Sequence, residues 1–240
     1  MAMVWQWAAR GKHPAAKDYF QLGSQVPMVE AFYGWFESGF QGLAATRQPA
    51  EKLCSWRFWA KGPNKDVLVC GLGKDSSDSV GRPFPMVIIG TGGLPDWRNQ
   101  WDLLPLACEG PWTHMEYLAA KPFSDLAELE AEIAHIKPPS KEWQELNAIR
   151  NAAKSRSALS GYDAMGEQAD DGLVIVTLDE QLQTDVAAAT SLLHGWLRQQ
   201  RPEVPTAVFI GGNSRWSAMA VFRRALAPRD FASLWCREAA

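Results

Sequence analysis

The stretch CSWRFWAKGPNKDVLVCGLGKDSSDSVGRPFPMVIIG, residues 54–90, determines the class of fold that we expect. Its segments CSWRFWA, DVLVCGL and FPMVIIG are short and rich in β-branched or aromatic residues, which predicts three strands. Parallel pairing needs a crossover of about a dozen residues or more, whereas the connections here are short and polar. We therefore expect an antiparallel meander at the centre of a sheet.

Helical patterns surround this meander. After Pro27, apolar residues recur at helical spacing and predict an amphipathic helix. They are Met28, Phe32, Trp35, Phe36, Phe40 and Leu43. Residues 94–108 and 125–136 also show helical patterns, a further helix follows Ser140, and the small, polar segment 155–172 predicts a mobile loop.

The last third of the chain alternates strand and helix patterns. Strands are expected at 173–178 and 206–212, with a helix at 180–200 between them and a short helix at 229–235. This order leaves open a βαβ unit joined to the same sheet. We predict the α+β class: a central, mostly antiparallel sheet flanked by helices, with a C-terminal α/β region packed against it.

We treat residues 1–240 as a single domain with an N-terminal lobe at about 1–122 and a C-terminal lobe at about 123–240. Within the first predicted strand, Trp56, Phe58 and Trp59 cannot all face the same side, because successive side chains alternate. Either helices cover both faces of the sheet or one aromatic side chain is exposed for a partner. The helical patterns on both sides of the meander favour coverage of both faces.

Composition narrows the function classes. The 240 residues carry a net charge of −3 with basic and acidic residues interspersed, so no patch for nucleic acid or an anionic membrane is indicated. No apolar run is long enough for a membrane span and no leader pattern opens the chain, so we expect a cytoplasmic protein. Four widely spaced cysteines indicate buried free thiols.

No catalytic, cofactor or metal motif is complete. The segment VCGLGKDSS lacks the Walker A spacing, and IIGTGGLP lacks the third glycine of a dinucleotide loop. The four histidines show no metal-ligand pairing, and there is no G-x-S-x-G elbow. The motifs therefore select no catalytic site, no cofactor and no metal, and an enzyme stays open at this point because a catalytic triad can assemble from distant positions.

Three segments resemble motifs of the TagF family, also called ImpM, which is associated with bacterial type VI secretion. They are GKHPAAKDYF near the N-terminus, SWRFW in the first meander strand and SSDSVGRPFPM before the third. Family motifs place candidate structural or interaction roles on Lys12, Asp18, Tyr19, Trp56, Arg57, Ser76, Asp78, Gly81, Arg82, Phe84 and Pro85. The three motifs occur in the family's order.

The resemblance implies an accessory protein that regulates the secretion system after translation, as a repressor acting by protein–protein interaction. It also implies a link to the forkhead-associated scaffold protein of that system as partner. Interaction rather than catalysis is the implied activity, so the resemblance implies a protein that is not an enzyme.

Elementary chemistry adds a structural expectation for the charged residues. Asp78 follows two serines and is expected to form an Asx-turn, and Gly81 permits a positive φ. Lys12, Asp18, Arg57, Asp78 and Arg82 are expected to form one ionic network. Arg82 is then either a structural clamp or a partner contact. The competing function is a phosphate- or nucleotide-sensing module or hydrolase that uses Lys12, Asp78 and Arg82.

Overall fold

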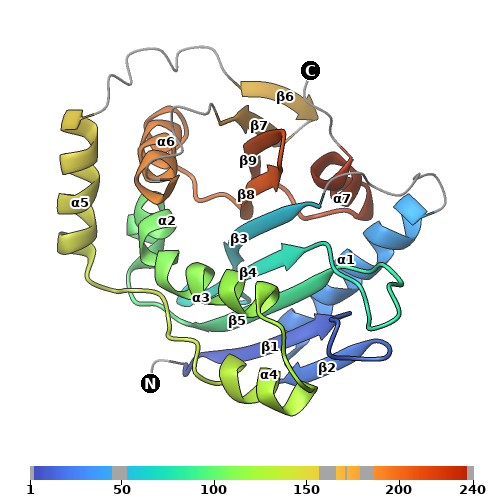
Figure 1. Ribbon diagram of the computed structural model, residues 1–240. Helices are drawn as coiled ribbons and strands as arrows, with labels where there is room; N and C mark the ends of the chain where they lie inside the picture. Colours follow the sequence, from blue (N-terminus) through green and yellow to red (C-terminus); the bar gives the residue numbers. More distant parts are fainter. Residues whose placement is uncertain (1–2, 45–52, 157–165, 171, 179–185, 237–240) are drawn as a thin grey trace.

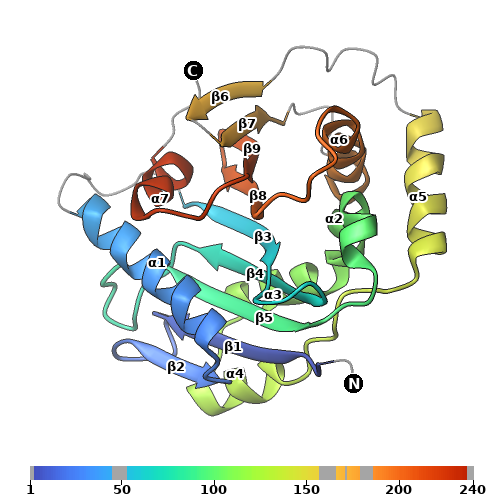
Figure 2. The ribbon, with the colours of Figure 1, turned by 180° about the vertical axis from the view of Figure 1, so that it is seen from behind.

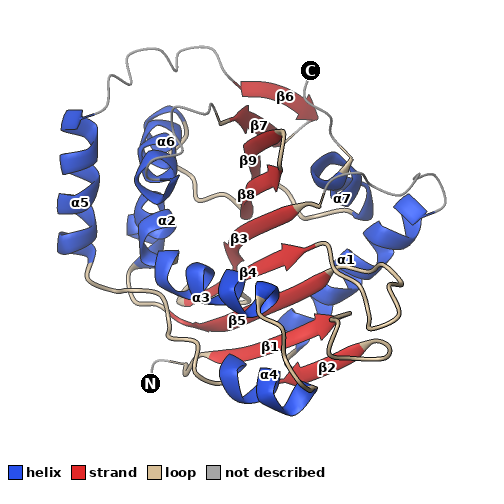
Figure 3. Cartoon of the chain, in the orientation of Figure 1, coloured by secondary structure: helices blue, strands red, loops and turns tan. Residues whose placement is uncertain are grey.

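The computed structural model describes residues 3–44, 53–156, 166–170, 172–178 and 186–236. Its described strands form one nine-stranded sheet in the order β2-β1-β5-β4-β3-β8-β9-β7-β6 (Figures 1 and 3). The strands are β1 (Gln6–Gly11), β2 (Phe20–Gly23), β3 (Ser55–Lys61), β4 (Val67–Lys74), β5 (Met86–Gly93), β6 (Gly166–Asp170), β7 (Leu173–Thr177), β8 (Ala207–Asn213) and β9 (Trp216–Phe222).

The meander predicted from residues 54–90 is confirmed. Strands β3, β4 and β5 are consecutive antiparallel neighbours, with Trp59 opposite Cys70 and Cys70 opposite Gly90. Strand β1 then pairs antiparallel with β5, so the N-terminal segment lies beside the last strand of the meander. This pairing brings the motif that follows β1 and the motif that precedes β5 to the same end of the sheet.

The C-terminal strands extend this sheet by hydrogen bonding. Strand β8 pairs antiparallel with β3, and Phe58 lies opposite Phe209. Strands β7 and β8 both pair antiparallel with β9, which lies between them, so they run parallel to each other without touching. The helix α6 (Val186–Gln200) connects β7 to β8, which makes a βαβ crossover split by an antiparallel strand. The α+β class is confirmed.

Helices cover both faces of the sheet, as predicted (Figures 1 and 2). One face packs against α1 (Pro27–Ala44) and α7 (Pro228–Trp235). The other packs against η1 (Trp97–Leu103), α2 (Leu104–Ala107), α3 (Glu109–Ala120), α4 (Leu126–Ile133) and α6, while α5 (Trp143–Arg156) packs on α6. Trp56 and Phe58 are buried on the α1 side and Trp59 on the other.

Two predictions for the second half of the chain are only partly covered by the described residues. Of the predicted loop at 155–172, residues 157–165 and 171 lie outside them. Residues 155–156 end α5 and Gly166–Asp170 forms β6, so the loop prediction is wrong for these two segments. Of the predicted helix at 180–200, residues 180–185 lie outside them and the remainder is α6. The sequence at 166–170 is polar and gave no strand pattern.

Two expectations from composition concern the whole chain. In the part of the chain that the structure describes, no helix has the length and apolar character that a membrane crossing requires. All four cysteines are free thiols, and Cys54, Cys70 and Cys108 are buried while Cys236 is exposed.

Candidate interaction site

The loop between β1 and β2 and the bend between β4 and β5 lie side by side at one end of the sheet, on the side opposite α5 (Figures 1 and 2). The backbone N–H of Ser79 donates to the carbonyl of Ala16 at 2.8 Å, which ties the two segments together. Ser77 and Pro83 form an isolated bridge that closes the bend, and the Phe84 N–H donates to the Ser76 carbonyl at 3.0 Å. The bend is thus a small hairpin.

Asp78 organises this hairpin. Its side chain is buried, and Oδ1 accepts the backbone N–H groups of Val80 at 3.1 Å and Arg82 at 2.9 Å. The Val80 bond is the Asx-turn expected from the sequence. Gly81 has φ of 83°, a left-handed conformation that glycine adopts without the penalty a side chain would bring. The local chemistry of residues 78–82 therefore fixes the shape of the turn.

Charged groups from both segments converge on Asp78. Its Oδ2 lies 3.0 Å from Lys12 Nζ and accepts the Arg82 Nε–H at 2.7 Å. Arg82 Nη2 lies 3.4 Å from Asp18 Oδ2 and donates to the Lys17 carbonyl at 2.6 Å. The predicted convergence of Lys12, Asp18, Asp78 and Arg82 is confirmed, and we call these four residues the Asp78 cluster.

The electrostatics of the Asp78 cluster keep its central carboxylate ionised. Burial raises the pKa of Asp78, but the Arg82 backbone N–H, the Lys12 ammonium and the Arg82 guanidinium outweigh that effect and lower the pKa to about 2. Asp78 therefore carries its negative charge at any physiological pH. Its two cations are held by opposite charge as well as by hydrogen bonds.

Aromatic side chains pack beside the Asp78 cluster. Phe84 is buried, and its ring centroid lies 4.8 Å from Tyr19 and 4.9 Å from Phe40 of α1. The Lys12 ammonium lies 4.7 Å from the centroid of the Tyr19 ring, at cation–π distance. A Cβ on Gly11 would lie 2.0 Å from the Pro85 carbonyl oxygen, so only glycine allows this close approach. Motif residues of both segments therefore pack against each other.

The outer surface of the cluster is exposed. Residues Ser79–Pro83 are all exposed, as is Tyr19. Val80 has 69% of its surface exposed, and the Arg82 side chain has 53% exposed. We call Tyr19 and residues 79–83 the docking tip. Sequence reasoning did not select Val80 as a site residue; the available signal was an apolar side chain inside an otherwise polar turn.

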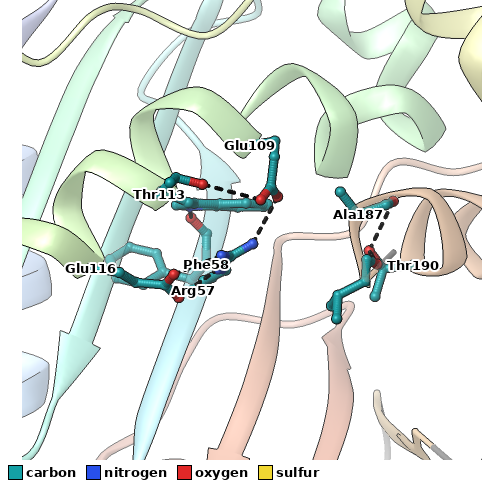
Figure 4. Close-up of polar contacts among 9 residues, drawn as sticks. Arg57, Phe58, Glu109, Thr113, Glu116, Ala187 and Thr190 are labelled. Atoms are coloured by element: carbon teal, nitrogen blue, oxygen red, sulfur yellow. Dashed lines mark hydrogen bonds and ion pairs between the residues drawn. The ribbon is translucent and has the colours of Figure 1, made fainter. Parts of the chain in front are cut away.

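Arg57 does not belong to the Asp78 cluster, so its predicted place in the network is wrong. It points to the opposite face of the sheet, where Nε and Nη2 donate to Glu116 and Nη1 donates to Glu109 of α3, each at 2.7 Å (Figure 4). The reason is strand alternation, which sets Arg57 on the face opposite that of Trp56 and Phe58. Its guanidinium borders a separate cavity of about 240 Å³ that reaches Thr190 of α6.

Trp56 is a core residue rather than a contact residue. It is 0% exposed, and its ring lies 5.7 Å from Trp216 and 6.4 Å from Trp235, both from the C-terminal part of the chain. The W-R-F motif of β3 therefore joins the N-terminal and C-terminal parts of the sheet: Trp56 and Phe58 pack under α1 and α7, and Arg57 binds α3.

The three motifs now have a defined geometry, and a comparison with known families accounts for their order. The description "TagF N-terminal domain, Type VI secretion system-associated" matches residues 8–137, which include the Asp78 cluster and β3. The chain belongs to the TagF family. Family membership associates it with type VI secretion.

Comparison with solved structures shows the same fold over the whole described chain. The crystal structure of PA0076 from Pseudomonas aeruginosa PAO1 is similar, with a TM-score of 0.54 and 17% sequence identity, covering 98% of this chain and 96% of that one. At this identity the likeness concerns the fold alone. A search of curated proteins finds no match.

Proposed function

We propose that this TagF family member is a cytoplasmic, non-enzymatic regulator that represses type VI secretion after translation by binding another protein. The docking tip is the contact surface in this proposal, and the forkhead-associated scaffold protein of the secretion system is the partner. Membership of a type VI secretion-associated family supports the part of this proposal that concerns the secretion system. The assignment of the docking tip as the contact surface rests on the Asp78 cluster. Its ion pairs fix a turn that exposes an apolar side chain, Val80, and a cationic one, Arg82.

The chemistry of the tip suits protein recognition. Tyr19 supplies a large ring of few rotatable bonds, Arg82 supplies a planar donor fork, and Val80 supplies an exposed apolar side chain. Tyrosine and arginine are enriched at the energetic centres of protein interfaces. Because the turn is already fixed by hydrogen bonds to Asp78, docking loses little conformational entropy.

The competing phosphate-sensing function has less support from the same geometry. Lys12 and Arg82, the cations that would bind phosphate, both contact the buried and ionised Asp78 carboxylate. The Lys12 side chain is buried, with 6% of its surface exposed, and Arg82 is further engaged by Asp18 and the Lys17 carbonyl, so few of their donors remain for a phosphate. The cations of the cluster thus serve to hold the turn, and a role for Lys12 in binding a ligand is disfavoured.

The test measures binding of the purified scaffold protein to a Val80→Asp variant by calorimetry. Val80 has 69% of its surface exposed, and its hydrogen bond to Asp78 uses the backbone N–H, which the substitution keeps. We therefore expect stability within about 0.5 kcal/mol of wild type and at least a tenfold loss of affinity. Ile149→Asp is the matched control, because Ile149 is also an exposed apolar residue but lies on α5, across the molecule from the tip. Unchanged affinity in Val80→Asp would exclude the tip as the docking surface.

Arg82→Ala separates the two roles left open for this residue. Weaker scaffold binding by a variant that unfolds at the wild-type temperature assigns Arg82 to the contact. A lower unfolding temperature with wild-type affinity at a temperature where the variant is folded assigns it to the clamp. Turnover of a phosphoester substrate by the wild-type chain, lost in Lys12→Gln, would overturn the non-enzymatic proposal.

A further inference from the structure

A second charged region lies between α5 and α6, far from the docking tip. It is a cavity of about 510 Å³, within the range of roughly 300–1,000 Å³ typical of small-molecule sites. Residues one turn apart on each helix line it: Arg150 and Lys154 on α5, and Leu192, Gly195, Trp196 and Gln199 on α6. Gly195 keeps the helix surface open beside the Arg150 guanidinium, which lies 3.6 Å from where a Cβ would be.

The wall of this cavity contains a preorganised pair of guanidinium groups. The buried carboxylate of Asp102 at the end of η1 accepts hydrogen bonds from Arg150 on one oxygen and from Arg198 on the other. Burial raises the pKa of Asp102, but the hydrogen bonds from both arginines outweigh it, so the pKa is lower than usual. Asp102 therefore fixes two cations in place at physiological pH.

Both arginines keep donors that Asp102 does not use, although Arg150 Nη2 also donates to Asn147 Oδ1 at 2.8 Å. Arg198 has no hydrogen-bond partner other than Asp102 among the described residues, which leaves its Nε and Nη2 donors without protein partners there. Lys154 is exposed and has no partner in the described part of the chain. Three cations thus line the cavity against one carboxylate, so the cavity attracts anions.

The remaining lining is apolar and aromatic. Leu192, the half-buried Trp196 indole and Pro202 form this part of the wall. Guanidinium groups bind phosphate oxygens with paired hydrogen bonds, and an indole offers a stacking surface for a planar base. We propose that the cavity between α5 and α6 binds a mononucleotide, with its phosphate at Arg150, Arg198 and Lys154 and its base against Trp196.

Calorimetry on the purified full chain tests this proposal with ATP, AMP, ribose 5-phosphate, inorganic phosphate and a glutamate decapeptide. We expect AMP or ATP to bind at least tenfold more tightly than ribose 5-phosphate or inorganic phosphate. Lys154→Gln is expected to weaken nucleotide binding about tenfold, because one charge-assisted hydrogen bond is lost. The matched control is Lys141→Gln, which changes an exposed lysine that precedes α5 and does not line the cavity.

A Trp196→Leu variant, verified as folded by circular dichroism, tests whether the nucleotide base stacks on the Trp196 indole. We expect it to bind AMP no more tightly than ribose 5-phosphate. The proposal is overturned by the absence of nucleotide binding at millimolar concentration, by equal affinity of Lys154→Gln and wild type, by equal affinity for AMP and inorganic phosphate, or by tighter binding of the glutamate peptide. None of these results bears on scaffold binding at the docking tip.

Discussion

Two buried carboxylates, Asp78 and Asp102, each hold two cationic side chains, but the cations are used differently. In the Asp78 cluster, Lys12 is itself buried, with 6% of its side chain exposed, and Arg82 is further engaged by Asp18 and the Lys17 carbonyl. Around Asp102, the Arg150 and Arg198 side chains are 20% and 38% exposed and border a cavity. The first cluster braces a loop, and the second presents donors to solvent.

The difference comes from the elements that carry the charges. The Asp78 cluster joins two connections between strands, whose backbone donors and acceptors need partners that the sheet does not supply. Asp102 joins side chains of two helices whose backbone groups already bond within the helix, so the arginines are not needed to satisfy backbone groups. Arg150 makes one further bond, to Asn147, and Arg198 makes none among the described residues. The same ion-pair chemistry thus fixes the conformation of the turn at Asp78, whereas at Asp102 it holds two guanidinium groups in the wall of the cavity.

The largest expected effect compares the two carboxylates directly. Asp78→Ala leaves the buried Lys12 ammonium unpaired and removes two hydrogen bonds of the turn, so we expect the unfolding temperature to fall by about 10 °C. Asp102→Ala leaves cations that water reaches, and we expect a fall of about 5 °C. Differential scanning calorimetry measures both, with the exposed Asp66→Ala as control. A larger fall for Asp102→Ala would contradict the comparison.

A second prediction concerns the pH dependence of stability. His194, beneath the Asp102 region, donates from Nδ1 to the Thr190 carbonyl and accepts the Trp59 indole N–H at Nε2, and burial lowers its pKa to about 4. It is therefore neutral when folded and binds a proton on unfolding below its ordinary pKa of 6.5. Stability is expected to fall by up to about 3 kcal/mol between pH 6.5 and pH 4.

Asp78 affects the free energy of unfolding at lower pH than His194 does, and it is an acid rather than a base. Its folded pKa of about 2 is below the usual 3.8, so its contribution is complete above pH 3.8 and is lost as the pH falls toward 2. Urea denaturation across pH 2–7 measures both windows. His194→Gln should flatten the upper window and Asp78→Asn the lower one. Identical pH profiles for wild type and either variant would contradict the assignment of that window.

The smallest expected effect concerns Gly195 in the interior of α6. A Cβ added at this position would lie 3.6 Å from Arg150 Nη1, which is an ordinary contact distance. Since alanine is favoured over glycine within a helix, we expect Gly195→Ala to raise the free energy of unfolding by about 0.5–1 kcal/mol, measured by urea denaturation. Destabilisation would show that the helices α5 and α6 approach more closely than described.

Local chemistry allowed the sequence to predict the meander, the helices on both faces and the turn at Asp78. Period-two patterns, helical spacing and the Asx–Gly turn each depend on residues close together in the chain. The approach of Asp18 to Arg82 was also predicted, from the opposite charges of residues that the family motifs had selected. These features together define the base of the docking tip.

Pairings between distant segments were not predictable in the same way. The antiparallel pairing of β3 with β8 brings together residues about 150 positions apart in the chain. No local sequence pattern specifies which strand pairs with β3. Arg57 was grouped with the wrong charges because no local pattern shows that Glu109 and Glu116 of α3 pack on its face of the sheet. The cavity was missed because Asp102, Arg150 and Arg198 come from three separate elements and form no motif.

Hydrogen–deuterium exchange shows directly whether the docking tip, held by the Asp78 cluster, is the surface that binds the scaffold protein. Exchange at the backbone amides of Tyr19 and of the non-proline residues in 76–85 is compared with and without the scaffold protein, at a concentration that saturates binding. We predict that protection increases at the docking tip while the amides of α5 exchange as before. Protection confined to other segments, with the tip unchanged in a saturated complex, would contradict the account.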